Sequence, residues 1–128
     1  MDLVTRSGTL PGSDEARDFV GSDHGAELTL ILIDAPTGHG PALHRHPYEE
    51  IFVVHGGSGT FVVDQSEVQA GAGDVVVAPA GTAHRFINSG RDRLRLTAIH
   101  HAPTFKTEWL EPLPSDQGYW SSPTNAAI

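Results

Sequence analysis

The chain has 128 residues and no cysteine, and its eight Lys and Arg residues against 16 Asp and Glu give a formal net charge of -8. This length is typical of a single domain that can bury its own core. The acidic balance repels polyanions, so nucleic acid and anionic membrane surfaces are unfavourable partners. Without cysteine, thiolate metal sites and thiol catalysis are excluded, and any metal must be bound by imidazole and carboxylate groups.

The N-terminal part carries no pattern of a signal peptide or a membrane-spanning helix. Met1 is followed by the acidic Asp2, and the longest apolar stretch, 28–33, is interrupted by Thr29. We therefore expect a cytoplasmic protein. Residues 1–26 are weakly patterned and are interpreted as an N-terminal arm or edge strand, in which 13–17 forms a capped helical turn or a loop.

Residues 27–102 are interpreted as the β-domain. They consist of short runs rich in Val, Ile, Leu, Phe and Thr, separated by Gly, Pro, Asn and Asp, which is typical of strands joined by tight turns. Strands are predicted over residues 27–34, 42–46, 50–55, 59–64, 67–70, 74–78, 83–88 and 93–101. Such regular spacing predicts an all-β sandwich or barrel.

The last segment, 103–128, is interpreted as a C-terminal arm. It is rich in proline and aromatic residues, namely Pro103, Trp109, Pro112, Pro114, Tyr119, Trp120 and Pro123. We expect this arm to lie on its own barrel or on a partner subunit, with one helical turn around 107–110. A barrel assembled from two open sheets leaves an edge strand that such arms cover, so a homodimer is expected.

His44 and His46 are the first candidate metal ligands. They lie two apart in a predicted strand, so both imidazoles project from one face, about 7 Å apart at the backbone. Two rings at this spacing can converge on one ion at metal–nitrogen distances of about 2.1 Å. Glu50 begins the next strand, where its carboxylate can reach the same centre, and His84 begins a strand after the turn at 79–81.

The spacing of these residues resembles the two conserved motifs of the cupin superfamily. The motifs read Gly38-x5-His44-x-His46-x3-Glu50-x6-Gly57 and Gly73-x5-Pro79-x-Gly81-x2-His84-x3-Asn88, with every fixed position present. The chain is therefore identified as a member of this superfamily, a small single-domain cupin. The resemblance implies a double-stranded β-helix, which is a jelly-roll barrel of two antiparallel sheets with a metal ion near its wider mouth. It also implies that His44, His46, Glu50 and His84 are the metal ligands.

The proposed ligand set limits the metal and its chemistry. Three imidazoles and one carboxylate favour Mn, Fe, Co, Ni, Cu or Zn over Mg and Ca, which prefer oxygen ligands. Four protein ligands on an octahedral ion leave two positions, enough for a bidentate substrate or for a substrate oxygen and dioxygen together. We therefore favour a metal-dependent enzyme, above all a dioxygenase. The alternatives are a Lewis-acid isomerase, cyclase or decarboxylase, and a non-catalytic cupin that binds a small ligand or stores a metal.

His100 is a candidate catalytic residue. Leu94, Leu96 and Ala98 form one face of the predicted strand, and His100 shares that face and should point into the barrel. An inward imidazole beside a metal-bound substrate can act as a general acid or base, because its pKa lies near neutral. The alternative is a histidine at the barrel rim. Loops or outward strand positions are assigned to the histidines that have no partner in the motifs, His24, His39 and His55.

The predicted pocket has hydrophobic walls. Strand parity turns five apolar side chains inward, Phe52, Val54, Phe86, Leu94 and Leu96, and four cations outward, Arg45, Arg85, Arg93 and Arg95. A phosphorylated or strongly anionic substrate normally requires an inward cation. We therefore expect a small, largely apolar or aromatic substrate with one or two chelating oxygens, such as a phenol or diketone.

Overall fold

The structure is a computed structural model that describes residues 3–112. Two short 3-10 turns, η1 (Ser7–Thr9) and η2 (Gly21–His24), accompany the strands of this part of the chain. The strands are β1 (Ala16–Phe19), β2 (Thr29–Ala35), β3 (His44–Arg45), β4 (Glu50–Gly56), β5 (Ser58–Val63), β6 (Ser66–Gly71), β7 (Val75–Ala78), β8 (His84–Ile87), β9 (Leu94–His100) and β10 (Glu108–Trp109). The all-β prediction is confirmed, and the predicted strands correspond to β2 through β9. In the described residues, no helix has the length and apolar character needed to span a membrane.

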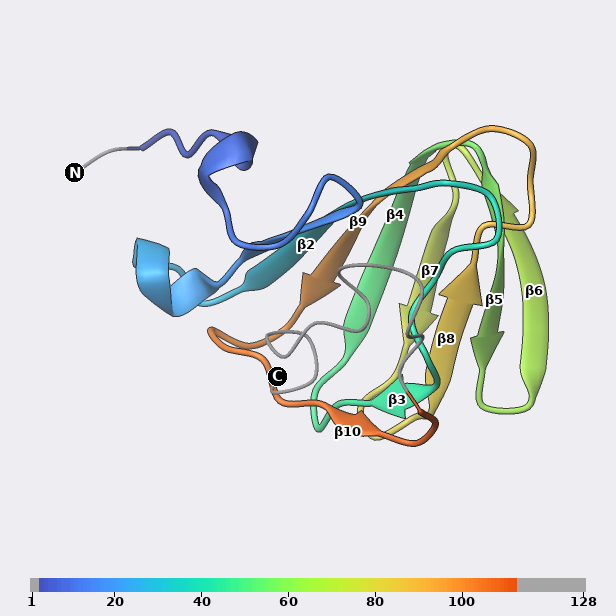
Figure 1. Cartoon of the computed structure of the whole chain (residues 1–128). Coiled ribbons are helices and arrows are strands. Elements are labelled where there is room, and N and C mark those ends of the chain that lie inside the picture. The colour runs from blue at the N-terminus through green and yellow to red at the C-terminus, as the bar shows by residue number, and fades with distance from the viewer. Residues whose placement is uncertain (1–2, 113–128) are drawn as a thin grey trace.

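The strands form two facing antiparallel sheets (Figure 1). Sheet A has the order β1-β2-β9-β4-β7, and sheet B has the order β10-β3-β8-β5-β6. Strands distant in sequence are neighbours, so that β9 lies between β2 and β4. Figure 1 shows β3 and β10 side by side at one end of the barrel, and β3 carries the candidate ligand His44.

Alternation along the central strands separates the core from the surface. In β9, Leu94, Leu96 and Ala98 are buried whereas Arg95 is exposed, and β4 buries Phe52 in the same way. Burying each large apolar side chain stabilises the fold by roughly 1.5–3 kcal/mol. The pattern continues to the end of each strand, where the inward residues are polar. The register pairs His100 of β9 with Glu50 of β4.

Two local predictions differ from the structure. Residues 13–15 form a loop, one of the two predicted alternatives, but 16–17 belong to strand β1, which pairs antiparallel with β2 along the edge of sheet A. The predicted helical turn at 107–110 is replaced by β10, in which Glu108 pairs with Arg45 and Trp109 with His44. In both places the open edge of a sheet offers backbone donors and acceptors, and pairing with them outweighs a weak local helix preference.

The C-terminal arm follows its own barrel as far as the structure describes it. Besides the β10–β3 pairing, the N–H of Leu110 donates to the carbonyl of Leu43 at 2.9 Å. The predicted arm residues Tyr119 and Trp120 lie outside the described residues.

Candidate metal centre

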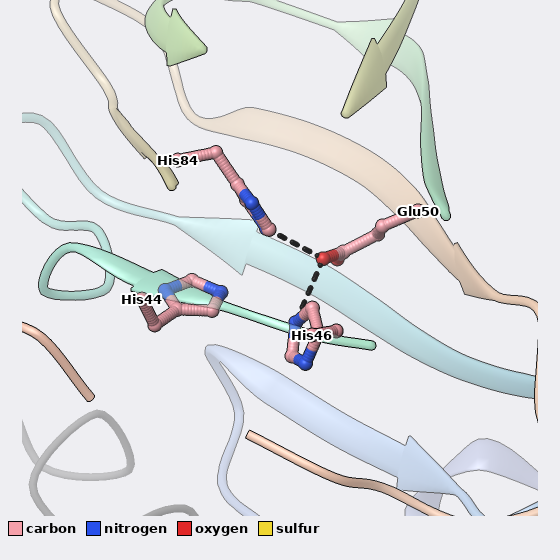
Figure 2. A group of neighbouring side chains, drawn as sticks. All are labelled: His44, His46, Glu50 and His84. Carbon is pink, nitrogen blue, oxygen red and sulfur yellow. Dashed lines mark hydrogen bonds and ion pairs between the residues drawn. The ribbon is translucent and has the colours of Figure 1, made fainter. Parts of the chain in front are cut away.

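Four polar side chains converge at the end of the barrel that carries β3 (Figure 2). They are His44, His46, Glu50 and His84, and one potential ligand atom of each lies within 4.8 Å of the others. All four residues are buried, with exposed fractions of 6% or less. The structure thus brings together the four residues that the motifs indicate as ligands.

Strand pairing and one tight turn place these residues. His44 of β3 lies directly opposite His84 of β8 in sheet B, whereas Glu50 projects from β4 in sheet A. The turn before β8 contains Gly81, whose φ of 77° is a left-handed conformation that glycine adopts without strain. The Gly81 N–H donates to the carbonyl of His46 at 2.7 Å, which ties this turn to the chain that carries two of the candidate ligands.

Backbone carbonyls set the tautomer of all three candidate histidine ligands. The Nδ1–H groups of His44, His46 and His84 donate to the carbonyls of Ala42 (2.7 Å), Lys106 (2.8 Å) and Thr82 (2.9 Å), respectively. Because a carbonyl oxygen only accepts, Nδ1 carries the proton and Nε2 presents its lone pair to the centre. Such outer hydrogen bonds are typical of histidines that bind metals.

The side-chain atoms that face one another in the centre are hydrogen-bond acceptors at short distances, an arrangement that a bound cation stabilises. The Oε1 atom of Glu50 lies 2.8 Å from Nε2 of His84 and 3.0 Å from Nε2 of His46. The buried Nε2 of His46 has no hydrogen-bond partner among the described residues. Lone pairs facing a carboxylate at these distances need a proton or a metal ion between them, so the donor set fits a divalent transition metal.

The electrostatics keep this donor set ready for a cation. Burial raises the pKa of Glu50, but the neighbouring His100, His46 and His84 outweigh burial and hold this pKa well below its ordinary value. Burial and the adjacent His84 lower the pKa of His44 from 6.5 to about 3. For His84, burial lowers the pKa, but contact with Glu50 raises it above its ordinary value. The centre therefore holds an ionised carboxylate and a neutral His44, the forms that bind metals, whereas a metal would replace the proton that Glu50 favours on His84.

His100 lies beside the four converging residues and is 2% exposed. Its Nε2 is 3.0 Å from Oε2 of Glu50, and its Nδ1 is 2.7 Å from the Tyr48 hydroxyl. Burial raises the pKa of Tyr48, so this hydroxyl keeps its proton. The hydroxyl also accepts from the N–H of Lys106 at 3.4 Å, which leaves its own O–H to donate to Nδ1 of His100. His100 thus lies on the cavity wall, and Tyr48 is a neighbour that the sequence did not reveal.

A small cavity of about 30 Å³ opens beside the centre. At roughly 10–15 Å³ per water, it has room for two or three water-sized molecules. Apart from the candidate ligands, His100 and Thr107, it is lined by apolar side chains, which are Ile31, Ile33, Pro41, Phe52, Phe86, Phe105 and Trp109. No Lys or Arg of the described residues is part of this lining.

The observed walls differ in part from the predicted ones. Phe52 and Phe86 line the cavity, whereas Val54, Leu94 and Leu96 do not and are packed in the core instead. Parity identifies which side chains of a strand point inward, but not how far each one lies from the mouth of the barrel. Each two-residue step along a strand moves the inward side chain about 6.6 Å further from the mouth. Ile31 and Ile33 could have been found from the alternation of residues 27–34. The walls formed by Thr107 and Trp109 were missed because 107–110 was predicted to be a helical turn, and Phe105 was assigned only to the C-terminal arm.

The remaining charged and histidine residues lie away from the centre. The four arginines that parity turns outward are exposed, and Arg45 and Arg93 form surface ion pairs with Glu108 and Asp34. His24 stacks on Phe19, His39 contacts Glu15, and His55 contacts Thr97. These contacts account for His24, His39 and His55, and the exposed His101 lies 3.7 Å from a carboxylate oxygen of Glu49.

The family model described as Cupin domain matches residues 31–100, a span that contains all four converging residues and His100. The chain belongs to the cupin family. This finding confirms the resemblance that the two motifs indicate. No curated protein sequence matches the chain.

Solved structures confirm the double-stranded β-helix. An uncharacterized conserved protein with a double-stranded β-helix domain from Klebsiella pneumoniae is 17% identical, with a TM-score of 0.70 over 87% of this chain and 99% of that one. Oxalate decarboxylase from Lactobacillus farciminis, in a formate complex, is 22% identical, with a TM-score of 0.70 over 80% of this chain and 34% of that one. The Bacillus subtilis oxalate decarboxylase is 16% identical, with a TM-score of 0.73 over 86% of this chain and 33% of that one. The chain thus spans about a third of these decarboxylases, and the likeness concerns the fold alone.

Proposed function

We propose that this protein is a metal-dependent cupin enzyme in which His44, His46, Glu50 and His84 bind one divalent transition-metal ion. The observation that carries this proposal is the convergence of three imidazole Nε2 atoms and a carboxylate, with each Nδ1–H already donating to a backbone carbonyl. The donor set suits Mn, Fe, Co, Ni, Cu or Zn. Manganese has a precedent in this fold, because Mn(II) centres are named for the Bacillus subtilis oxalate decarboxylase.

A bound ion would supply Lewis acidity or, if it is redox-active, electron exchange with dioxygen. The chain's own residues supply the rest. Phe52 and Phe86 exclude water from one side of the site. We propose His100 as the catalytic residue that holds and moves a proton at Nε2, because this atom is buried beside the cavity and the Tyr48 hydroxyl supports the opposite side of the ring.

Within this class we propose a dioxygenase that acts on a small, largely apolar or aromatic substrate with chelating oxygen. The apolar lining and the lack of Lys or Arg among the described lining residues support this substrate class. One observation favours a second candidate, a Lewis-acid decarboxylase of a very small acid. The cavity has room for only a few water-sized molecules, and proteins of similar fold act on oxalate.

The test begins with metal analysis of protein purified without oxygen and without chelators. Oxygen uptake is then measured with phenols and diketones, and carbon dioxide release is measured with oxalate. Substrate-dependent oxygen uptake supports the dioxygenase, whereas carbon dioxide release without oxygen consumption supports the decarboxylase. Glu50→Ala should lose the metal while Glu49→Ala, a neighbouring half-exposed carboxylate, should keep it. Full metal occupancy in Glu50→Ala would contradict the ligand assignment.

We also propose that the barrel forms a homodimer. The edge strand β7 of sheet A carries two exposed valines, Val75 and Val77, and open edge strands of this kind favour association. Sedimentation velocity should give twice the mass of the chain. A single-chain mass at every concentration would contradict this proposal.

A further inference from the structure

The segment 105–109, which we call the C-terminal strap, forms one wall of the cavity although it lies outside the family match at 31–100. Its side chains alternate as in an extended strand. Phe105, Thr107 and Trp109 line the cavity beside the candidate metal centre, whereas Lys106 and Glu108 line only an adjacent surface groove, which Thr107 also borders. The strap therefore presents every second side chain to the space that a ligand would occupy.

Each inward side chain of the strap touches a residue of the centre. The ring centroids of Trp109 and His44 are 4.9 Å apart. Those of Phe105 and His100 are also 4.9 Å apart, in an edge-to-face arrangement. The Thr107 hydroxyl is 3.2 Å from Nδ1 of His46. A ligand that enters beside the ion would thus meet the aromatic rings of Phe105 and Trp109.

The strap is also the wall that is least firmly attached. Ile31, Phe52 and Phe86 belong to longer strands that pair on both sides within the sheets. The strap is held by the two-residue pairing of β10 with β3 and by a few hydrogen bonds, together with the surface pair between Arg45 and Glu108. Exposed ion pairs of this kind contribute little to stability.

We propose that Phe105 and Trp109 are specificity-determining residues of the metal centre, which restrict its ligand to one flat ring or less, with chelating oxygens directed at the ion. This inference rests on the proposed function. A cavity of about 30 Å³ is much smaller than an apolar cavity of about 150 Å³ that binds benzene, so the strap must shift to admit even one ring. A single ring can then stack against Phe105 and Trp109, whereas a second fused ring requires a larger displacement of the strap and therefore binds more weakly.

The experiment uses two probes with the same chelating group, catechol and its fused-ring analogue 2,3-dihydroxynaphthalene. Both are titrated into Co(II)-loaded full-length protein, with the visible Co(II) spectrum as the readout of the metal site and calorimetry as the readout of affinity. The wild-type protein should prefer catechol about tenfold or more, and Trp109→Ala should lower this preference at least about tenfold. Phe105→Ala should act in the same direction. Lys106→Ala is the matched control, since its side chain faces away from the cavity, and it should keep the wild-type preference.

Trp109→Phe provides a second measure in case Trp109→Ala disturbs β10. It retains a smaller ring and should give an intermediate preference. A normal Co(II) spectrum with the same preference in every variant would overturn this inference alone, as would a Co(II)-loaded wild-type protein that binds neither probe. If the wild-type protein develops no Co(II) spectrum that depends on Glu50, the proposed function fails, and this inference fails with it.

Discussion

The Nδ1–H of His46 donates to the carbonyl oxygen of Lys106 at 2.8 Å, so the C-terminal strap holds a candidate metal ligand as well as forming a wall of the cavity. The backbone N–H of Lys106 donates to the Tyr48 hydroxyl, which in turn contacts His100. One peptide segment thus reaches both sides of the centre. Because outer hydrogen bonds fix the orientation of ligand rings, loss of one typically lowers metal affinity by about 10–100-fold.

Addition of metal should stabilise the protein against unfolding. A ligand that binds only the folded state at about 100 times its Kd adds about 2.7 kcal/mol. For a domain of this size, the melting temperature should then rise by on the order of 10 °C. Differential scanning calorimetry of chelator-treated protein with and without Zn(II) measures this shift. Glu49→Ala should show the same rise, and an equal rise in Glu50→Ala would mean that the metal binds elsewhere.

Metal-free protein should lose stability as the pH falls below 6.5. The pKa of His44 is about 3 in the folded state against its ordinary 6.5, so the unfolded state takes up a proton first. This difference removes up to about 1.4 kcal/mol for each pH unit between 6.5 and 3. The lowered pKa of Glu50 acts in the same direction at lower pH. His84, whose pKa is raised, contributes stability that is already fully present below pH 6.5, so it does not change this slope.

Urea unfolding of the metal-free protein at a series of pH values measures this effect. His44→Asn removes the titrating group and should flatten the dependence between pH 6.5 and 4.5. An unchanged slope in that variant would show that another group is responsible.

Tyr48→Phe should leave metal binding intact but disturb His100. The substitution removes the hydroxyl that contacts Nδ1 of His100 at 2.7 Å and leaves a buried polar atom without this partner. The expected loss of unfolding free energy is about 1–3 kcal/mol. Turnover should fall through kcat, with its pH profile shifted, because the ring that we propose to carry the proton loses its support.

The double variant Tyr48→Phe/His100→Leu checks the origin of that loss. If the two residues act through their mutual contact, the combined effect should be smaller than the sum of the single effects by about 0.5–3 kcal/mol. Strict additivity would argue against a functional pair.

Asn88→Ala should destabilise the fold without affecting the metal. The buried Asn88 amide donates to the carbonyls of Ala35 and Asp92, and its oxygen accepts from the N–H of Gly90. Removal leaves one buried and two partly buried backbone groups without this partner, so about 1–3 kcal/mol of unfolding free energy should be lost. Chemical unfolding measures the loss, and metal analysis should give wild-type content. Reduced metal content in folded protein would show that this motif residue also supports the centre.

The sequence predicts the long strands of this fold correctly, but not short elements such as β10. In β4 and β9, seven residues with one buried face are enough for alternation to show that Glu50 and His100 point inward. The motif spacing then names the four residues that the fold brings together. The strap could not be predicted in this way, because β10 has two residues and its partner β3 lies some sixty positions earlier. Tyr48 lies between strands, where no periodicity applies.

The support that the strap gives to His46 comes from a backbone carbonyl, whereas its contact with the ligand space comes from side chains. Any residue at position 106 supplies the same carbonyl. Thr107 also contacts Nδ1 of His46 through its hydroxyl, so only substitutions at 105 and 109 leave the support of His46 unchanged. At these two positions the selectivity for a ligand can be altered while the metal-binding residues stay in place.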